Sequence, residues 1–290
     1  MTEKAYAKIN LYLDVISRRT DGFHDIESVM HTLSLCDELE FSFSPSGKTE
    51  ISLKVVGNDS IPADESNLVV KAAVTYLESV GERVSIHVTL KKMIPSSAGL
   101  GGGSSDAAAT LRALNKHFDN RLSDSELLSL GARLGSDVPF CLFGGTAVCR
   151  GRGELLTEAT VKEKMYFVVA IGEGSVSTPK AYSLLDKRYS NFDGSVDRGG
   201  KADISSLLSD LDGGVIPSYS IYNVFEEEIA KELSEVLEIK KELLSLGATS
   251  AMMSGSGPSV FGLFETEASA ENAKKKLSEL GYHAFAAKSL

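Results

Sequence analysis

Hydrophobic residues alternate with polar ones at the start of the chain. In residues 5–16, small and aliphatic side chains occupy every second position, so Lys8 and Asn10 share the opposite face. A period of two is typical of a β-strand with one buried face. Residues 84–94 repeat this pattern and predict a second such strand. Residues 38–57 contain two alternating runs separated by Pro-Ser-Gly, which predicts a hairpin.

Three segments have the spacing of amphipathic helices. Residues 66–81 place Ser66 where a helix N-cap is expected, and a glycine ends the periodic run. Residues 104–118 form an alanine-rich helix directly after a glycine cluster. Residues 123–135 begin with a serine that is followed three positions later by glutamate, which is the pattern of a capping box.

The second half of the chain mixes short strands with helices. Residues 138–151 are apolar and interrupted by glycine, which predicts a pair of strands, and residues 165–172 predict a central, fully buried strand. Further along, the pattern gives strand, strand, helix and strand in the ranges 249–255, 259–264, 269–281 and 283–290. Residues 187–203 are polar and lack periodicity, so we expect a mobile loop there.

The order of these elements predicts an α+β protein of two lobes. We expect the boundary near residues 155–165, which gives domains of 1–158 and 159–290. A chain of 290 residues is long enough for two ordinary domains packed together.

Composition and charge narrow the class of protein. The net charge of −10 argues against a surface devoted to nucleic acid or to an anionic membrane, yet a few lysines can still hold a small anion. The odd number of cysteines, Cys36, Cys141 and Cys149, favours a reducing compartment. No signal peptide or membrane-length apolar run is evident. We therefore expect a cytoplasmic protein with a small-molecule partner, either a monomer or a weak homodimer.

The most distinctive stretch is Pro-Ser-Ser-Ala-Gly-Leu-Gly-Gly-Gly-Ser-Ser-Asp at residues 95–106. Four of the five residues from Gly99 to Gly103 are glycine, and the stretch connects a predicted strand to a predicted helix. Glycine lets the backbone approach a ligand closely, and the N–H groups that begin a helix attract anions. A tight strand–helix turn without a ligand explains the glycines equally well. The sequence is not a Walker loop, because the required lysine is missing.

Three further motifs remain ambiguous by themselves. Lys8 and Asn10 could face solvent or a ligand. Phe23 and His24 lie in Asp-Gly-Phe-His, which reads first as a turn and second as a site for a planar ligand. Asp137 follows the end of a predicted helix, where a capping role is usual. Residues 254–258, Ser-Gly-Ser-Gly-Pro, are most simply a turn, or else a second loop facing a phosphate.

Taken in their order along the chain, these motifs resemble the GHMP small-molecule kinases. Ala-Lys-Ile-Asn, the glycine stretch, Gly-Ser-Asp-Val-Pro and Ser-Gly-Ser-Gly-Pro match over essentially the full length. The resemblance implies an N-terminal lobe like ribosomal protein S5 domain 2 and a ferredoxin-like C-terminal lobe. It also implies ATP-dependent phosphorylation of a tertiary alcohol, the 2-hydroxyl of a methylerythritol unit linked to cytidine diphosphate.

The resemblance assigns chemical roles to individual residues. Asp137 would accept the proton of the hydroxyl group, because a tertiary alcohol is a poor acid. Lys8 would lie beside that carboxylate and stabilise developing charge, and Asn10 would orient the substrate. His24 would hydrogen-bond to the edge of the cytosine, while the rings of Phe23 and Tyr182 would sandwich it.

The same resemblance places ATP on the glycine stretch. The residues implied to surround the phosphates are Pro95, Gly99, Leu100, Gly101, Gly102, Gly103, Ser104 and Ser105. Asn67 and Lys92 match positions near the nucleotide base, and Ser105 and Asp106 match positions near Mg²⁺. The chain departs from the family pattern at Phe23, where tyrosine is frequent, and at Asp106, where some members carry asparagine.

Two other functions stay open from the sequence. Another GHMP kinase, of the homoserine or mevalonate type, would share the phosphate loop, but it has no need of an aromatic sandwich for cytosine. A nucleotide-binding regulator without turnover would need neither the proton acceptor Asp137 nor Lys8.

Overall fold

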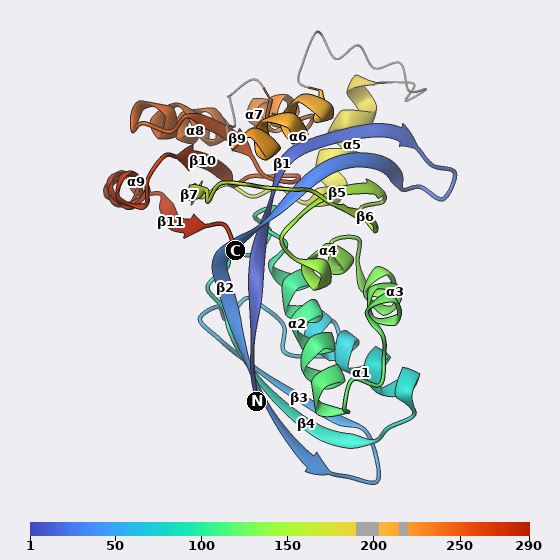
Figure 1. Cartoon of the computed structure of the whole chain (residues 1–290). Coiled ribbons are helices and arrows are strands. Elements are labelled where there is room, and N and C mark those ends of the chain that lie inside the picture. Colours follow the sequence, from blue (N-terminus) through green and yellow to red (C-terminus); the bar gives the residue numbers. More distant parts are fainter. Residues whose placement is uncertain (190–202, 215–219) are drawn as a thin grey trace. The chain divides into compact units, whose positions relative to one another are not determined.

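The computed structural model describes residues 1–189, 203–214 and 220–290, and these form two compact units (Figure 1). Unit 1 comprises Met1–Ala7, Cys36–Ser96 and Gly101–Gly144; unit 2 comprises Lys8–Leu35, Ser97–Leu100 and Gly145–Leu290. Neither unit is one continuous stretch of sequence, and a single boundary after residue 158 stays a prediction. Most of the predicted loop at 187–203 lies outside the described residues.

The sheet of unit 1 places β4 between β2 and β3. The bounds of these strands are β2 His24–Pro45, β3 Glu50–Val56 and β4 Val84–Lys91. β4 is antiparallel to β2 and parallel to β3, so the hairpin predicted for residues 38–57 is wrong. Alternation predicts strands without predicting their partners. A parallel pair needs a long crossover, and α1 (Leu68–Val80) supplies it between β3 and β4.

The helices of unit 1 begin and end where capping chemistry permits. They are α1 Leu68–Val80, α2 Gly102–His117, α3 Asp124–Leu134 and α4 Val138–Phe143. Asn67, and not Ser66, caps α1 by accepting from Val69 N. The predicted capping box of α3 is confirmed. Residues 138–143 form a helix where a strand was predicted, since Pro139 suits the first turn of a helix.

The core of unit 1 lies between β4 and the helices. Alternate side chains of β4 are buried as predicted, and the alanines in the middle of α2 are fully buried against them. Small side chains let α2 pack closely on α1. This packing fixes the direction of α2. The first turn of α2 contains the end of the glycine stretch, from Gly102 onward.

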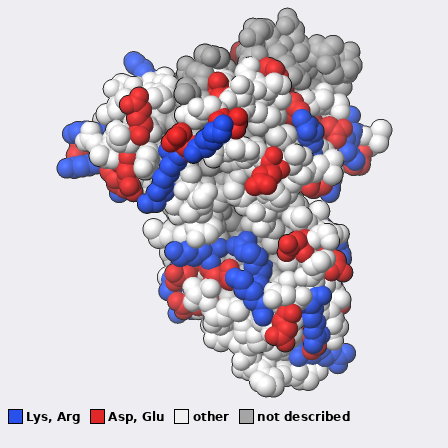
Figure 2. All heavy atoms as spheres, in the orientation of Figure 1, with Lys and Arg blue, Asp and Glu red and all other residues white. Residues whose placement is uncertain are grey.

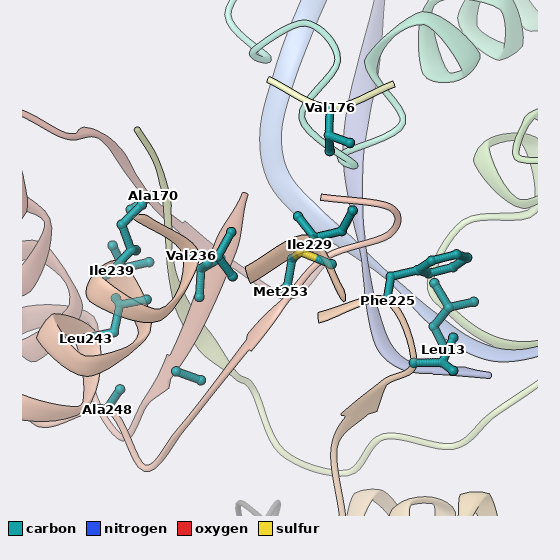
Figure 3. Packing of buried hydrophobic residues seen from close by; sticks show 14 of the residues in the cluster. Leu13, Ala170, Val176, Phe225, Ile229, Val236, Ile239, Leu243, Ala248 and Met253 are labelled. Carbon is teal, nitrogen blue, oxygen red and sulfur yellow. The ribbon is translucent and has the colours of Figure 1, made fainter. Parts of the chain in front are cut away.

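Unit 2 contains a four-stranded antiparallel sheet in the order β11-β7-β10-β9. Its strands are β7 Tyr166–Ile171, β9 Ser250–Met253, β10 Val260–Phe264 and β11 His283–Lys288. The central position predicted for β7 is confirmed. α8 (Glu235–Ser245) and α9 (Glu267–Glu279) pack on the sheet. In Figure 3, Val236, Ile239 and Leu243 of α8 lie in the buried cluster that also contains Ala248 and Met253.

The remaining elements lie in unit 2, except for residues 2–7 of β1, which belong to unit 1, and they carry several candidate residues. They are β1 Thr2–Arg18, β5 Thr146–Gly151, β6 Leu155–Glu158, α5 Thr178–Arg188, α6 Ile204–Gly213, β8 Tyr222–Asn223 and α7 Glu226–Glu232. β1 pairs with β8 in parallel, and β5 pairs with residues 26–31 of β2. Both faces of β1 are buried, so the solvent-exposed face considered for Lys8 and Asn10 is wrong.

The surface carries charges of both signs. Basic side chains adjoin acidic ones on the face drawn in Figure 2. Ion pairs such as Lys91 with Glu38 and Lys240 with Glu226 are examples of this local balance. Within the described residues, no helix is long and apolar enough to span a membrane.

Candidate active site

The first part of the glycine stretch, residues 97–100, is fixed by hydrogen bonds within unit 2. The backbone N–H of Lys8 donates to the carbonyl of Leu100 at 3.0 Å. The hydroxyl of Ser259 donates to the carbonyl of Ala98 at 2.5 Å. Strand β1 and the start of β10 therefore hold this backbone from two directions.

Gly99 contacts the turn between β9 and β10 so closely that no side chain fits. Its φ is +76°, and a Cβ there would lie 2.1 Å from the carbonyl oxygen of Ser254. A Cβ on Gly255 would lie 2.9 Å from the carbonyl oxygen of Gly99. The hydroxyl of Ser254 donates to that same oxygen at 3.1 Å. β9 and β10 are antiparallel neighbours, so the turn predicted at 254–258 is confirmed.

The second part of the glycine stretch begins α2 in unit 1. Gly101 is the N-cap residue with φ +69°, and no described side chain caps the helix there. The N–H groups of a first turn have no intrahelical acceptor, and the helix dipole adds partial positive charge. The hydroxyl of Ser105 donates back to the carbonyl of Gly102 at 2.9 Å. Backbone N–H groups at this end of α2 are suited to phosphate oxygens.

A buried ion cluster lies directly beneath this first turn. The ammonium of Lys92 donates to a carboxylate oxygen of Asp37 and, at 2.7 Å, to Oδ2 of Asp106. The other oxygen of Asp37 accepts from the backbone N–H groups of Met93 and Ile94. All three charged side chains are at least nine-tenths buried. The cluster thus ties α2 to the end of β4.

Burial and charge shift the titration of this cluster in opposing ways. Burial alone would lower the pKa of Lys92, but the charges of Asp106 and Asp37 outweigh it and raise that pKa. Burial, together with the charge of Asp37, raises the pKa of Asp106 to about 7 against the attraction of Lys92. Oδ1 of Asp106 is buried with no hydrogen-bond partner among the described residues.

The cluster explains the departure at Asp106, because Lys92 offsets its charge. The same cluster also affects whether Ser105 and Asp106 can bind Mg²⁺, as the resemblance implies. Within the described residues no three His, Cys, Asp or Glu side chains gather as they would in a site that binds a metal without phosphate ligands. The carboxylate of Asp106 already faces a cation, so Ser105 and Asp106 do not fit a site that holds a metal by protein ligands alone. The roles predicted for Lys92 and Asn67 beside a nucleotide base stay predictions. Asn67 caps α1 and donates to the carbonyl of Pro62.

Asp137 lies in unit 1 at the turn between α3 and α4. It is the N-cap residue of α4, but its carboxylate does not cap that helix. The turn lies beside the start of α2: a Cβ on Gly135 would lie 4.0 Å from the hydroxyl of Ser104. Unit 1 therefore brings the turn that carries the predicted proton acceptor to the same end of α2 as the N–H groups that are predicted to bind phosphate.

Lys8 and Asn10 lie together on β1 in unit 2. The ammonium of Lys8 donates to Oδ1 of Asn10 at 2.8 Å, and Nδ2 of Asn10 donates to the hydroxyl of Ser28 at 2.8 Å. The exposed fractions are 4% for Lys8 and 1% for Asn10. A charge kept this far from water interacts strongly with whatever approaches it. The substrate-orienting role predicted for Asn10 stays a prediction.

Phe23 lies on the turn that joins β1 and β2. The carboxylate of Asp21 accepts from the backbone N–H of Phe23, and Gly22 has φ +86°, so the predicted turn is confirmed. Half of Phe23 is exposed, and the guanidinium of Arg152 lies 4.9 Å from its ring centroid. An exposed ring held by a cation is available to stack on a flat ligand.

His24 and Tyr182 come together in unit 2 although far apart in sequence. Their rings stack at 4.7 Å between centroids with an interplanar angle of 28°. Nε2 of His24 is 2.8 Å from Oδ1 of Asp186, and Tyr182 also packs edge-on against Phe225. One face of Tyr182 is thus covered by the imidazole. The sandwich predicted between Phe23 and Tyr182 stays a prediction.

Four residues of these clusters escaped the sequence analysis. Asp37 and Ser28 lie inside long strand patterns, where a lone polar residue usually reaches solvent; Asp186 and Arg152 pair with candidates distant in sequence. A charged residue in the middle of a buried strand was the one available signal, and it applied to Asp37.

Comparisons with known proteins identify the family of this chain. Residues 67–145 match the family model "GHMP kinases N terminal domain", and residues 214–283 match "GHMP kinases C terminal". The chain is 40% identical over 268 residues to 4-diphosphocytidyl-2-C-methyl-D-erythritol kinase of Geobacillus thermodenitrificans, covering 91% of this chain and 88% of that protein. It is 36% identical over 282 residues to the protein of that name from Clostridium tetani, covering 96% and 95%.

Solved structures show the same fold. A crystal structure of 4-(cytidine 5'-diphospho)-2C-methyl-D-erythritol kinase matches with a TM-score of 0.81 and 32% identity, covering 99% of this chain and 98% of that one. A homoserine kinase from Cytophaga hutchinsonii matches with a TM-score of 0.73 at 20% identity, covering 100% and 94%, which shows a shared fold alone. The predicted two-lobed fold is confirmed, and this chain belongs to the GHMP family of ATP-dependent small-molecule kinases.

Proposed function

We propose that this chain transfers the γ-phosphoryl group of ATP to the 2-hydroxyl of 4-diphosphocytidyl-2-C-methyl-D-erythritol. The observation that carries the proposal is the 40% identity, over 91% of this chain, to a kinase that is named for that substrate. The pair of His24 with Tyr182 in unit 2 supports it separately, since an imidazole beside an aromatic ring is suited to a flat base.

In this proposal Asp137 accepts the proton of the substrate hydroxyl. A tertiary alcohol loses its proton reluctantly, so a carboxylate within hydrogen-bond reach assists the attack on phosphorus. The support is the position of the Asp137 turn beside Ser104 at the start of α2. Lys8 contributes positive charge that stabilises the developing charge of the transferred group.

The glycine stretch holds the phosphates of ATP through its backbone N–H groups. Phosphoryl transfer depends on positioning and on neutralising charge, and backbone N–H groups at the start of a helix contribute to both. Magnesium, when bound, neutralises phosphate charge. Because Asp106 pairs with Lys92, we propose that the hydroxyl oxygen of Ser105, rather than the carboxylate of Asp106, would face magnesium bound together with the phosphates.

On the substrate side, His24 hydrogen-bonds to the cytosine and the ring of Phe23 covers it. Asp186 fixes the imidazole of His24, because its carboxylate accepts a hydrogen bond from Nε2 when the proton of the ring is on that nitrogen. The cytoplasmic location and the monomeric or weakly dimeric state also stay predictions.

A substrate panel tests the proposal. Purified protein is assayed for ADP release with the cytidyl substrate, cytidine-free methylerythritol phosphate, mevalonate and homoserine. We expect turnover with the cytidyl substrate and at most one-hundredth of its kcat/KM with the others. Asp137→Ala should lower kcat by at least about a hundredfold while ATP still binds. Equal turnover of the cytidine-free compound would contradict the substrate, and near-normal turnover of Asp137→Ala would contradict the role of Asp137.

A further inference from the structure

We propose that Ser28 is a positioning residue for this reaction: its hydroxyl fixes the amide of Asn10, which in turn holds the ammonium of Lys8. The inference rests on the proposed function, in which Lys8 stabilises the charge of the transferred group. Ser28 belongs to β2 and has no solvent exposure, so we assign it a role through Asn10.

The direction of the hydrogen bond from Ser28 follows from its neighbours. Its Oγ lies 2.6 Å from the carbonyl oxygen of Tyr12. A carbonyl oxygen can only accept, so the single proton of the Ser28 hydroxyl points toward Tyr12. The oxygen of Ser28 is therefore left as an acceptor for its second neighbour, which is the side chain of Asn10 at 2.8 Å.

This acceptor determines which way the Asn10 amide faces. Only the NH₂ group of an amide can donate, so Nδ2 must face Ser28, and Oδ1 then faces the ammonium of Lys8 at 2.8 Å. The ammonium imposes the same orientation independently, because it too can only donate. A flipped amide would direct NH₂ at the ammonium and place Oδ1 against an oxygen whose proton is committed to Tyr12.

Removing the hydroxyl would take away one of the two restraints on this orientation and leave only the ammonium of Lys8. With alanine at position 28, Nδ2 of Asn10 loses its acceptor at a site with 1% exposure, and a buried donor without that partner is costly. Rotation of the amide would then lower that cost while moving Oδ1 away from Lys8. Charge misplaced by a fraction of an ångström slows phosphoryl transfer without weakening the hold on ATP, which lies on the glycine stretch.

A double-mutant cycle tests the inference with four proteins: wild type, Ser28→Ala, Asn10→Ala and the double variant. We expect Ser28→Ala to lower kcat about tenfold with less than a twofold change in KM for ATP. In the Asn10→Ala background the same substitution should lower kcat less than twofold, because the amide through which Ser28 acts is gone. A tenfold loss in both backgrounds, or an Asn10→Ala variant with normal kcat, would overturn the inference.

Ser28→Cys separates the hydrogen bond from packing. Cysteine fills the space of the hydroxyl but is a weak hydrogen-bonding group, so we expect the same loss of kcat as in Ser28→Ala with a smaller loss of thermal stability. A Ser28→Cys variant with wild-type kcat would overturn the proposal. Failure of the proposed substrate would look different: the wild type itself would turn over another alcohol of the panel, and the cycle is then measured with that alcohol.

Discussion

The two parts of the glycine stretch are held by different physical means. Residues 97–100, in unit 2, are held by N–H and hydroxyl groups that donate to backbone carbonyls at close range. Residues 101–106, in unit 1, begin a helix above an ammonium that lies between two buried carboxylates. The first part is fixed by shape, which tolerates no added atom. The second is fixed by the attraction between one ammonium and two carboxylates. It therefore tolerates a small added side chain better than the loss of a charged group.

Gly99→Ala breaks the shape-held part and should have the largest effect. An L-residue at φ +76° is strained, and its Cβ would overlap the carbonyl of Ser254 at 2.1 Å. Strain and overlap together should lower the free energy of unfolding by about 4 kcal/mol. Turnover should fall below detection, because the displaced backbone belongs to the proposed phosphate loop. Urea unfolding and the ADP-release assay measure the two losses.

Gly103→Ala is the matched control for stability. Gly103 has no positive φ, and a Cβ there would meet only the side chain of Leu68, at an ordinary 3.5 Å. Within a helix, alanine is favoured over glycine by up to about 1 kcal/mol. The Gly103→Ala protein should therefore be as stable as wild type or slightly more so. Equal destabilisation by both substitutions would show that the two parts do not differ in the way described.

Lys92→Met breaks the charge-held part and should have the second largest effect. It leaves Asp37 and Asp106 buried together without their cation, which should cost about 3 kcal/mol. The KM for ATP should rise, because the start of α2 loses its support. Lys91→Met is the control: Lys91 also pairs with two carboxylates, but its side chain is 47% exposed, and exposed pairs contribute roughly 1 kcal/mol or less. Similar urea midpoints for the two variants would argue against a charge-held cluster.

Lowering the pH should destabilise unit 2 through its buried histidine, His31. Of the three changes, after Gly99→Ala and Lys92→Met, it should lower the free energy of unfolding least. Burial lowers the pKa of His31 from 6.5 to about 4, and its Nδ1 lies 2.7 Å from the hydroxyl of Thr146. Between these pKa values the unfolded chain takes up a proton that the folded chain does not. The free energy of unfolding should therefore fall as the pH decreases from 6.5 toward 4, by about 2 kcal/mol at pH 5.

His31→Gln isolates this contribution. The variant has no imidazole to protonate, so its free energy of unfolding should fall less than that of wild type between pH 8 and pH 5. Urea titrations at several pH values give both curves. If the curves of the two proteins run parallel, His31 contributes nothing to the acid sensitivity of unit 2.

Much of the secondary structure follows from the local sequence pattern. The errors lie where the structure of a segment depends on the segments that it contacts in the fold. Alternation located β4, a continuous apolar run located β7, and the serine–glutamate pattern located the start of α3. The hairpin predicted at 38–57 was wrong because the partner of β3 is β4, which follows α1 in the sequence. Residues 138–143 became a helix because proline and the tight α3–α4 turn outweigh the β-propensity of an apolar run.

The candidate site shows the same limit. Glycine spacing and motif order indicated a phosphate loop and a kinase, and the comparisons confirm the family. Ser28 and Asp37 were not predictable, since their roles depend on Asn10 and Lys92, which approach only in the folded chain. For Asp106, sequence raised the question of an unexplained charge, and only the position of Lys92 answered it.

The interleaving of the two units has a consequence for how the chain is made. Unit 1 ends at Gly144, so all of its segments exist when half of the protein has been synthesised. Leu13 and Ile26, by contrast, pack against Val224 and Phe225, which are made much later. Chains grow at roughly 5–20 residues per second. For several seconds, therefore, residues 8–35 are tethered at both ends to segments of unit 1 while their later partners in unit 2 are missing, and their apolar side chains need protection from aggregation during that time.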